Sequence, residues 1–159
     1  MTTGDRQYFE LFNEIGIIAQ LTRTIMETRL PDGLTLPHFS VVNHLVRLGD
    51  GVTPRALAAA FQVPRNTMTN TLSGLEKRGL IEIRPNPEDG RSRQVFLTAE
   101  GRTFREQAID ALAPDIRRIA TRIHPKDIEA VLPNLIRMRQ ALDQIREPAA
   151  PVSRLNSEN

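Results

Sequence analysis

Polar side chains recur at regular steps between residues 66 and 77. Their spacing of four, three and four residues places them on one face of a helix, and this polar stripe consists of Asn66, Asn70, Ser73 and Lys77. Three apolar residues of the same segment fall on the opposite face, which we expect to be buried: Met68, Leu72 and Leu75. Asparagine can pair with an adenine edge and lysine with a phosphate, so the stripe suits the major groove of duplex DNA. An ordinary solvated helix face would show the same pattern.

Small residues adjoin the polar stripe on both sides. Thr67 and Thr69 flank it and could bind phosphates, although threonine also contacts bases and their methyl groups. Gly74 lies beside the stripe and permits close approach. Arg65 opens the segment and is a further candidate for contact with DNA.

A second basic group follows in residues 84–93. Arg91 comes directly after Gly90, where we expect a hairpin tip, because glycine permits a turn that a side chain would hinder. An arginine there can enter a narrow, electronegative minor groove. Asp89 could pair with Arg84 or Arg93 and hold the loop in shape, and a solvated loop is the alternative. The candidate DNA-binding residues are therefore Arg65, Asn66, Thr67, Thr69, Asn70, Ser73, Lys77, Arg84, Asp89, Arg91 and Arg93.

Two short helices are predicted to carry the polar stripe. Thr53 followed by Pro54 is typical of a helix start, and the helix that follows should bury Leu57, Ala58 and Phe61. Residues 62–64 predict a tight turn, and residues 65–78 a second helix that ends at Gly79. Two short helices joined in this way form a helix-turn-helix.

A short hairpin is predicted to carry the second basic group. Residues 80–84 and 94–97 are expected to form its strands, and residues 85–90 have strong turn chemistry. A hairpin with an arginine-bearing loop directly after a helix-turn-helix is a wing. The fold class predicted is mainly α with this small β-hairpin.

Longer helices are predicted before and after this winged region. Residues 5–30 carry apolar side chains at steps of three and four and should end at residues 31–33. A second helix should open at Pro37 as its first residue, close at residues 49–51, and bury Phe39, Val42, Leu45 and Val46. The helix capped by Thr98 should run to about Ile123 and kink near Pro114. A last helix over residues 126–145, bent at Pro133, should bury a further apolar set: Ile128, Val131, Leu132, Leu135, Ile136 and Leu142.

These terminal helices carry more apolar surface than one small lobe can cover, so we expect a two-fold dimer with intertwined terminal helices. The predicted organisation is one domain over residues 1–159. Residues 1–34 and 110–147 are assigned to dimerisation helices, residues 35–105 to a winged helix-turn-helix lobe for DNA binding, and residues 148–159 to a flexible tail.

Composition excludes several classes of protein. The chain has no cysteine, which removes disulfides and thiol redox sensing. Residues 1–8 are polar, so we expect no signal peptide, and no apolar run is long enough to span a membrane. The net charge is only +2, but residues 55–105 carry nine Lys and Arg against five acidic residues, a local charge of +4. Nineteen of the 21 basic residues are arginine, which favours bidentate contacts with phosphate and guanine, or else reflects genome composition. We expect a cytoplasmic protein.

Catalytic and metal chemistry find little support. His38 and His44 lie six residues apart, which is not the spacing of a helical ligand pair, and with His124 they are better explained as polar core or pocket residues. No phosphate-cradling glycine loop and no catalytic grouping of Asp, Glu and His is present. No enzyme activity, metal or cofactor is expected.

The segment from Arg84 to Gly101 closely resembles the wing of the multiple-antibiotic-resistance regulator (MarR) family. That pattern has an Asp, any residue and an Arg (Asp89 to Arg91), then an apolar-x-Leu-Thr strand end (Val95 to Thr98) and a Gly. The upstream segment resembles the same family's helix-turn-helix in several spaced residues: Leu57, Ala58, Thr67, Thr69, Leu72, Leu75, Glu76, Gly79 and Leu80. The match covers about residues 35–105 in detail.

The resemblance implies an obligate dimer on a palindromic site, with recognition helices in successive major grooves and wing arginines in the flanking minor grooves. It also implies a small-molecule pocket between the dimer helices and the DNA-binding lobe, with an aromatic or amphipathic acid as effector. Two departures are Asn70, where many relatives carry Arg, and Pro64, where many carry Ser. The first bears on base preference and the second on helix capping.

A ligand-responsive repressor of transcription is therefore the expected function, with a winged helix used for protein docking or nonspecific DNA architecture as the alternative.

Overall fold

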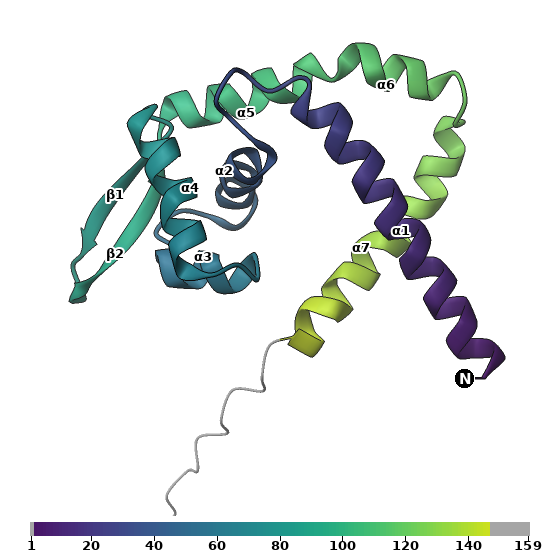
Figure 1. The fold of residues 1–159 in the computed structure, drawn as a ribbon, viewed down its shortest axis with the longest axis horizontal. Coiled ribbons are helices and arrows are strands. Elements are labelled where there is room, and N and C mark those ends of the chain that lie inside the picture. The colour runs from purple at the N-terminus through teal and green to yellow at the C-terminus, as the bar shows by residue number, and fades with distance from the viewer. Residues whose placement is uncertain (1, 147–159) are drawn as a thin grey trace, which may run out of the picture. The chain divides into compact units, whose positions relative to one another are not determined.

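The computed structural model describes residues 2–146, and the chain divides into two compact units, residues 1–115 and 116–159. In chain order the elements are α1 (Thr3–Glu27), α2 (Leu36–Leu48), α3 (Pro54–Ala60), α4 (Arg65–Lys77), β1 (Ile81–Asn86), β2 (Asp89–Leu97), α5 (Ala99–Ala111), α6 (Ala113–Ala120) and α7 (Pro125–Arg146) (Figure 1). The boundary between the units falls within α6. The predicted fold class, mainly α with one small antiparallel hairpin, is confirmed. The tail predicted at residues 148–159 lies outside the described residues.

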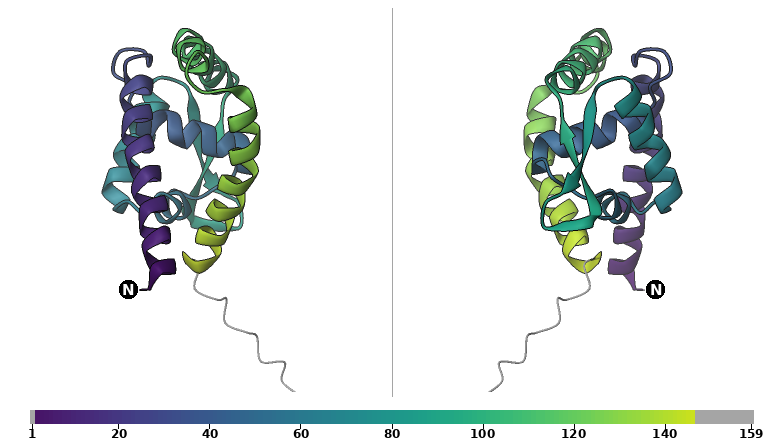
Figure 2. Two further views of the ribbon diagram at one scale, coloured as in Figure 1. Left: turned by 90° about the vertical axis from the view of Figure 1, so that its right-hand side faces the viewer. Right: turned by 90° about the vertical axis from the view of Figure 1, so that its left-hand side faces the viewer.

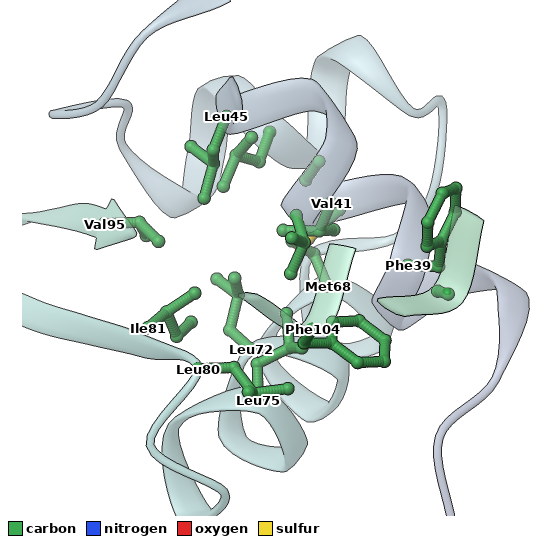
Figure 3. Packing of buried hydrophobic residues seen from close by; sticks show 14 residues of the cluster. Phe39, Val41, Leu45, Met68, Leu72, Leu75, Leu80, Ile81, Val95 and Phe104 are labelled. Carbon is green, nitrogen blue, oxygen red and sulfur yellow. The ribbon is translucent and has the colours of Figure 1, made fainter. Parts of the chain in front are cut away.

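One hydrophobic core holds the first unit together. Its buried members come from α2, α3, α4, the hairpin and α5, and they are Phe39, Val41, Val42, Leu45, Leu57, Ala58, Met68, Leu72, Leu75, Leu80, Ile81, Val95, Phe104 and Ala108. Side chains from the hairpin and from α4 converge in this core (Figure 3). Burying each large side chain of this kind contributes about 1.5–3 kcal/mol. The core therefore fixes α4 and the hairpin as parts of one body.

Helix starts follow the sequence signals in this unit. The Thr53 side chain accepts a hydrogen bond from the Ala56 backbone N–H at 3.1 Å, with Pro54 as the first helical residue. The Thr98 hydroxyl accepts from the Gly101 N–H at 2.9 Å and donates to the Gly79 carbonyl at 2.7 Å. Gly79 has φ of +68°, a conformation that glycine adopts without strain. These contacts confirm the predicted caps of α3 and α5.

Two helix boundaries differ from the prediction, by three residues for the end of α1 and by one for the start of α2. α1 ends at Glu27, before the Pro31 turn, and α2 begins at Leu36, so that Pro37 is its second residue. In α2, Val41 is buried, whereas the predicted Val46 is only half-buried. The reason is that α2 is packed by α4, α5 and β2 together, so a wide face that includes Val41 is covered.

The hairpin is longer than the sequence predicted. β1 and β2 pair antiparallel with Ile81 opposite Leu97, and the predicted loop over residues 85–90 shrinks to Pro87 and Glu88. Pro85 lies in β1 where the register shifts, a position at which the missing N–H costs little. At the hairpin base, Val52 pairs with Val95 as a single bridge. The two strands lie side by side and twist about each other (Figure 2).

The helix predicted to run to about Ile123 with a kink near Pro114 is divided there into two helices, and the second ends at Ala120. α5 ends at Ala111 and α6 begins at Ala113, with Leu112 between them. Pro114 is thus the second residue of a new helix, where the lack of an N–H does little harm. Pro133 lies inside α7, as predicted.

The terminal helices contrast with this core. α1 contains no buried residue. Met26 of α1 and Leu30, which follows the helix, are partly buried and pack against the core. The residues that α7 was predicted to bury are 37–52% exposed within the chain, so that prediction was wrong for a single copy. No helix in the described part of the chain is long and apolar enough to cross a membrane.

Candidate nucleic-acid interface

Helix α4 presents the polar stripe on the side that the core leaves uncovered. Its buried face consists of Met68, Leu72 and Leu75, which are 2%, 1% and 0% exposed, so the predicted core side is confirmed. Three members of the stripe are exposed and the fourth is half-buried: Asn66, Asn70 and Lys77, then Ser73. The structure therefore brings the predicted residues together on one face of a helix whose orientation is fixed by its other face.

The turn into α4 leaves its first residues accessible. Gln62 adopts φ of +52°, and the Val63 N–H donates to the Ala58 carbonyl at 3.0 Å. Pro64 occupies the N-cap and provides no side-chain cap. Within the first turn, the Asn66 side-chain oxygen accepts from the Thr67 N–H at 2.9 Å, and Arg65 is exposed. The Asn66 amide nitrogen remains available as the donor end of that side chain.

Hydroxyl groups along α4 are bonded to the helix itself. The Thr69 hydroxyl donates to the Arg65 carbonyl at 2.9 Å, and the Thr71 hydroxyl donates to the Thr67 carbonyl at 3.1 Å. Such bonds fix the side-chain rotamer of a threonine in a helix. They also use the only proton that each hydroxyl has. The expectation that Thr69 binds phosphate by its hydroxyl thus competes with a bond already made.

The flank of α4 near α2 is closed by a histidine. A Cβ added at Gly74 would come within 2.5 Å of His38 Nε2, so the small size of Gly74 serves packing against α2. His38 Nδ1 lies 3.1 Å from the Thr35 N–H and 2.8 Å from the Thr35 hydroxyl, which ties the ring to the start of α2. Burial lowers the pKa of His38, and the nearby charge of Arg78 lowers that pKa further. His38 is therefore a half-buried capping residue behind α4.

The hairpin tip is held by a small hydrogen-bond network. The Arg91 N–H donates to Asp89 Oδ1 at 3.0 Å, and the Glu88 N–H donates to Asn86 Oδ1 at 3.1 Å. Across the turn, Asn86 Nδ2 donates to the Ser92 hydroxyl at 2.9 Å. Asp89 thus shapes the tip through a backbone N–H rather than through an ion pair with Arg84 or Arg93. Arg91 is exposed beyond this network.

Gly90 does not have the role that the sequence suggested. Its φ lies outside the left-handed region, and a Cβ added there would meet no atom within 4 Å. The reason is that the turn is made at Pro87 and Glu88, while Gly90 already belongs to β2. Any residue with ordinary strand geometry fits at this position.

Arg84 is engaged by its own strand and its neighbour. Its guanidinium donates to Glu82 Oε2 through Nε at 2.9 Å and through Nη2 at 2.6 Å. The same guanidinium lies 4.7 Å from the centre of the Phe96 ring. Both charged side chains are more than half exposed, so the pair is weak, but it offers Arg84 an alternative to a phosphate. Arg93, in contrast, is an exposed residue of β2.

Two positioning contacts were not found from the sequence. Asp50 Oδ1 accepts from the Leu97 N–H at 2.9 Å, and Asp50 Oδ2 lies 3.3 Å from Arg102, so Asp50 joins the hairpin base to α5. A Cβ at Gly101 would overlap the Leu80 carbonyl oxygen, so α5 packs against the start of β1 only with glycine there. The aspartate follows directly after a helix-ending glycine, but only the fold shows what it binds.

Among the described residues, no group of three or more His, Asp and Glu side chains is placed to hold a metal ion. His44 instead packs beside the Phe61 ring, with ring centres 5.2 Å apart. These positions agree with the interpretation of His38 and His44 as packing residues.

Comparison with known proteins places this geometry in a family. A model of the MarR family matches residues 32–92. The transcriptional regulator HosA of Escherichia coli O111:H- is 32% identical over 98 residues, which make up 62% of this chain and 71% of that protein. The multiple antibiotic resistance protein MarR of Escherichia coli K12 is 29% identical over 136 residues, or 80% of this chain and 94% of that protein.

Solved structures agree in fold. A mutant of Escherichia coli MarR in complex with operator DNA superposes with a TM-score of 0.64 and 26% identity, covering 83% of this chain and 94% of that one. The PcaV regulator of Streptomyces coelicolor in complex with its natural ligand gives a TM-score of 0.60 and 25% identity, covering 80% and 89% of the two chains.

An exposed polar helix face and an arginine-tipped hairpin on a common core define a winged helix-turn-helix DNA-binding protein. The chain belongs to the MarR family of transcription regulators.

Proposed function

We propose that the chain is a sequence-specific repressor that acts as a homodimer on a palindromic operator in the cytoplasm. One observation carries this proposal: α4 and the base of the hairpin share a single core, so the polar stripe and the wing that carries Arg91 belong to one body. A helix in a major groove and an arginine in the adjacent minor groove need to be carried by one body. The choice of repression over activation rests on family resemblance.

The candidate residues divide by role. Asn70, with Asn66 and Ser73, would contact base edges, because amide groups can pair with adenine. Lys77 and Arg65 would bind phosphates and set the register of the helix on the duplex. On the wing, Arg91 would enter the minor groove with Arg93 beside it. Supporting roles would fall to Thr67, Arg84 and Asp89, and Thr69 would contact DNA beside Asn70.

Homodimerisation is supported by the apolar surface of the terminal helices. α1 exposes Tyr8, Phe9, Phe12, Ile18 and Leu21 at 46–66% of their surface. So many large apolar side chains exposed along one helix are typical of an interaction surface. In the proposal, residues 1–34 and 110–147 form the dimer and residues 35–105 bind one operator half-site each. A two-fold dimer then explains a palindromic operator.

An effector site is supported by a hollow between α1, α2 and α4. Its volume is about 240 Å³, and its walls are Arg23, Leu36, Pro37, Ser40, Val41, Phe61, Val63, Thr67, Met68 and Thr71. Mainly apolar walls with one guanidinium and several hydroxyls suit a small aromatic or amphipathic acid. Because α4 forms one wall, a ligand that prefers a different position of α4 would lower DNA affinity. That PcaV is described with a natural ligand supports regulation by a small molecule.

The effector proposal predicts that benzoate, used as a probe, weakens operator binding more than benzyl alcohol of similar size. Arg23→Gln should abolish this difference while leaving operator affinity in the absence of ligand unchanged. Equal effects of the acid and the alcohol, or none from either, would contradict the proposed site.

Selection of bound sequences from a random DNA pool tests the main proposal. We expect one palindromic sequence to be enriched, and competition binding should show that it is bound much more tightly than random DNA. Asn70→Ala should cost about 1–3 kcal/mol on that operator and flatten preference at one base position. Lys77→Ala should instead weaken binding to all DNA sequences alike. It should also make the slope of log affinity against log salt concentration shallower by about one unit per site.

The alternative function, protein docking or nonspecific DNA architecture, predicts another result. The selection would then recover no preferred sequence, and Asn70→Ala would weaken operator-like and random DNA by the same factor. The absence of any preferred sequence excludes the repressor proposal, whereas an equal effect of Asn70→Ala on both DNAs shows that Asn70 does not read bases.

A further inference from the structure

Thr69 is exposed on α4 next to the polar stripe, yet its hydroxyl is occupied within the helix. The hydroxyl donates to the Arg65 carbonyl at 2.9 Å, one helical turn earlier. A threonine hydroxyl has a single proton, so in this state its oxygen can only accept hydrogen bonds. DNA phosphates offer acceptors and no donor. The Thr69 hydroxyl is therefore a poor phosphate ligand, and the γ-methyl group is the part of the side chain left to contact a partner.

The position of Thr69 distinguishes it from the other threonines of α4. Thr67 and Thr71 line the hollow shared with α2, so their flank of the helix is turned toward the protein. Thr69 is not among the residues that line this hollow, and it lies directly before Asn70 and one turn before Ser73. Its methyl group is thus carried on the flank that stays open beside the proposed base readers.

We propose that Thr69 is a specificity-determining residue that recognises thymine through contact between its γ-methyl group and the 5-methyl group of the base. This inference rests on the proposed function. In the major groove, thymine presents only the O4 acceptor and the 5-methyl group. An acceptor-only hydroxyl gains nothing from O4, whereas an apolar group gains from covering the methyl. With Asn70 beside it reading adenine, α4 would favour A·T base pairs at this part of each half-site.

The test uses two variants of the full chain and one change in the DNA. Thr69→Val keeps the methyl group and removes the hydroxyl, while Thr69→Ser keeps the hydroxyl and removes the methyl group. Each thymine of the selected operator is replaced in turn by deoxyuridine, which lacks only the 5-methyl group. Dissociation constants are measured for every pairing of protein and DNA.

We expect one thymine per half-site whose replacement lowers the affinity of the unmodified protein by about fourfold, the value of one buried methyl group. Thr69→Val should bind within about twofold of the unmodified protein and keep this deoxyuridine effect. Thr69→Ser should lose about fourfold on the thymine operator and show no deoxyuridine effect at that position.

Thr71 provides the matched control, since its hydroxyl makes the same kind of bond within α4 but it lies on the other flank. Thr71→Ser should retain the full deoxyuridine effect. The proposal is overturned if Thr69→Val loses affinity while Thr69→Ser does not, or if all proteins respond alike to deoxyuridine. Failure of the proposed function is distinct, because the unmodified protein would then select no operator at all.

Discussion

The helix-turn-helix region and the terminal helices treat their apolar side chains in opposite ways. The described buried residues all lie between Phe39 and Ala108, and none belongs to α1, α6 or α7. Yet α1 and α7 also carry apolar side chains at helical spacing, as α2 and α4 do. Along α7, side chains such as Ile128 and Leu132 are about half exposed. The same sequence pattern therefore led to burial in one region and to exposure in the other.

Helical periodicity of apolar residues gives only part of the information about burial. An apolar stripe predicts that a helix face will be covered, but not by what. In the lobe, the neighbours are supplied by the following elements of the same chain. In α1, exposed side chains such as Phe9 and Leu21 need cover from another source, which the proposal assigns to a second copy.

Placing a charge on the exposed apolar surface of α1 should affect operator binding most. Leu21 is 62% exposed in the single chain, so Leu21→Asp should not disturb the lobe core. In the proposed dimer it would bury an unpaired carboxylate, which is strongly unfavourable. We expect a monomer by sedimentation equilibrium and a loss of operator affinity of roughly a hundredfold or more, because two linked half-site contacts become one.

Leu48 offers the matched control in the lobe. It is 66% exposed at the end of α2, so Leu48→Asp makes the same chemical change at an equally accessible leucine. This variant should remain dimeric and keep its operator affinity to within a few-fold. If both variants behave alike, the contrast between the two regions does not describe assembly.

A second prediction concerns the lobe alone. Gly101→Ala would force a methyl group into the Leu80 carbonyl oxygen, so α5 must shift away from the start of β1. We expect the free energy of unfolding in urea to fall by about 1–3 kcal/mol. Gly90→Ala serves as the control because it meets open space, and it should change stability by less than about 0.5 kcal/mol. Equal effects would mean that the packing at Gly101 is loose.

The sequence predicted the lobe well because its signals are local. The caps at Thr53 and Thr98, the buried face of α4 and the break before Pro114 each depend on residues within a turn or two. The polar face of α4 followed directly, since it is the face opposite Met68 and Leu72. Local patterns of this kind are what propensity and periodicity can report.

Features that depend on contacts distant in sequence were missed or wrong. Asp50 binds the Leu97 N–H across 47 residues, and no local pattern marks that contact. Asp89 was considered as a partner of Arg84 or Arg93, but Arg84 instead binds Glu82, two residues before it in β1, and lies over the Phe96 ring of β2. The turn was placed at Gly90, although Pro87 and Glu88 make it. The place of the turn follows from the register in which β1 pairs with β2, which no single local signal fixes.

A third prediction separates DNA binding by the lobe from assembly by the termini. Arg91 is exposed beyond the Asp89 network, so Arg91→Ala should leave folding and dimerisation intact. Operator affinity should fall by about tenfold with A·T-rich flanks and by less with G·C-rich flanks, because a narrow minor groove strengthens the negative potential. Affinity measured on flank-swapped operators provides the check.

Arg91→Lys sharpens this result. A lysine keeps the charge but is more strongly hydrated, so it should recover only part of the lost affinity. Equal losses on both kinds of flank would make Arg91 a general phosphate contact. No loss at all would mean that the hairpin tip does not touch DNA.

The smallest expected effect concerns the pH dependence of the lobe, through His38 behind α4. The neutral ring accepts the Thr35 N–H at Nδ1, and protonation would remove that acceptor. A charged ring would also be only partly solvated and would face Arg78, the charged group that acts on it from the end of α4. No carboxylate enters among the causes of the shift, and the Arg78 guanidinium itself donates to the Asp32 carbonyl at 2.9 Å. Both effects favour the neutral form, so the folded pKa lies below the ordinary value of 6.5.

As the pH falls through 6.5, His38 takes up its proton more readily in the unfolded chain than in the folded one. Its contribution to stability is therefore complete above that pH and is lost progressively as the pH falls toward the folded pKa. Urea unfolding between pH 8 and pH 5 should show this loss, and His38→Asn should reduce the change of the free energy of unfolding with pH. Arg78→Gln should raise the pKa of His38, seen as a shift of its ring resonances in an NMR titration, because one repulsive charge is removed. A His38 resonance that titrates above the ordinary histidine value would contradict this account. Since His38 lies in the lobe, the pH dependence of the free energy of unfolding should persist in the Leu21→Asp monomer. If it disappeared there, the terminal helices would have to contact the surroundings of His38.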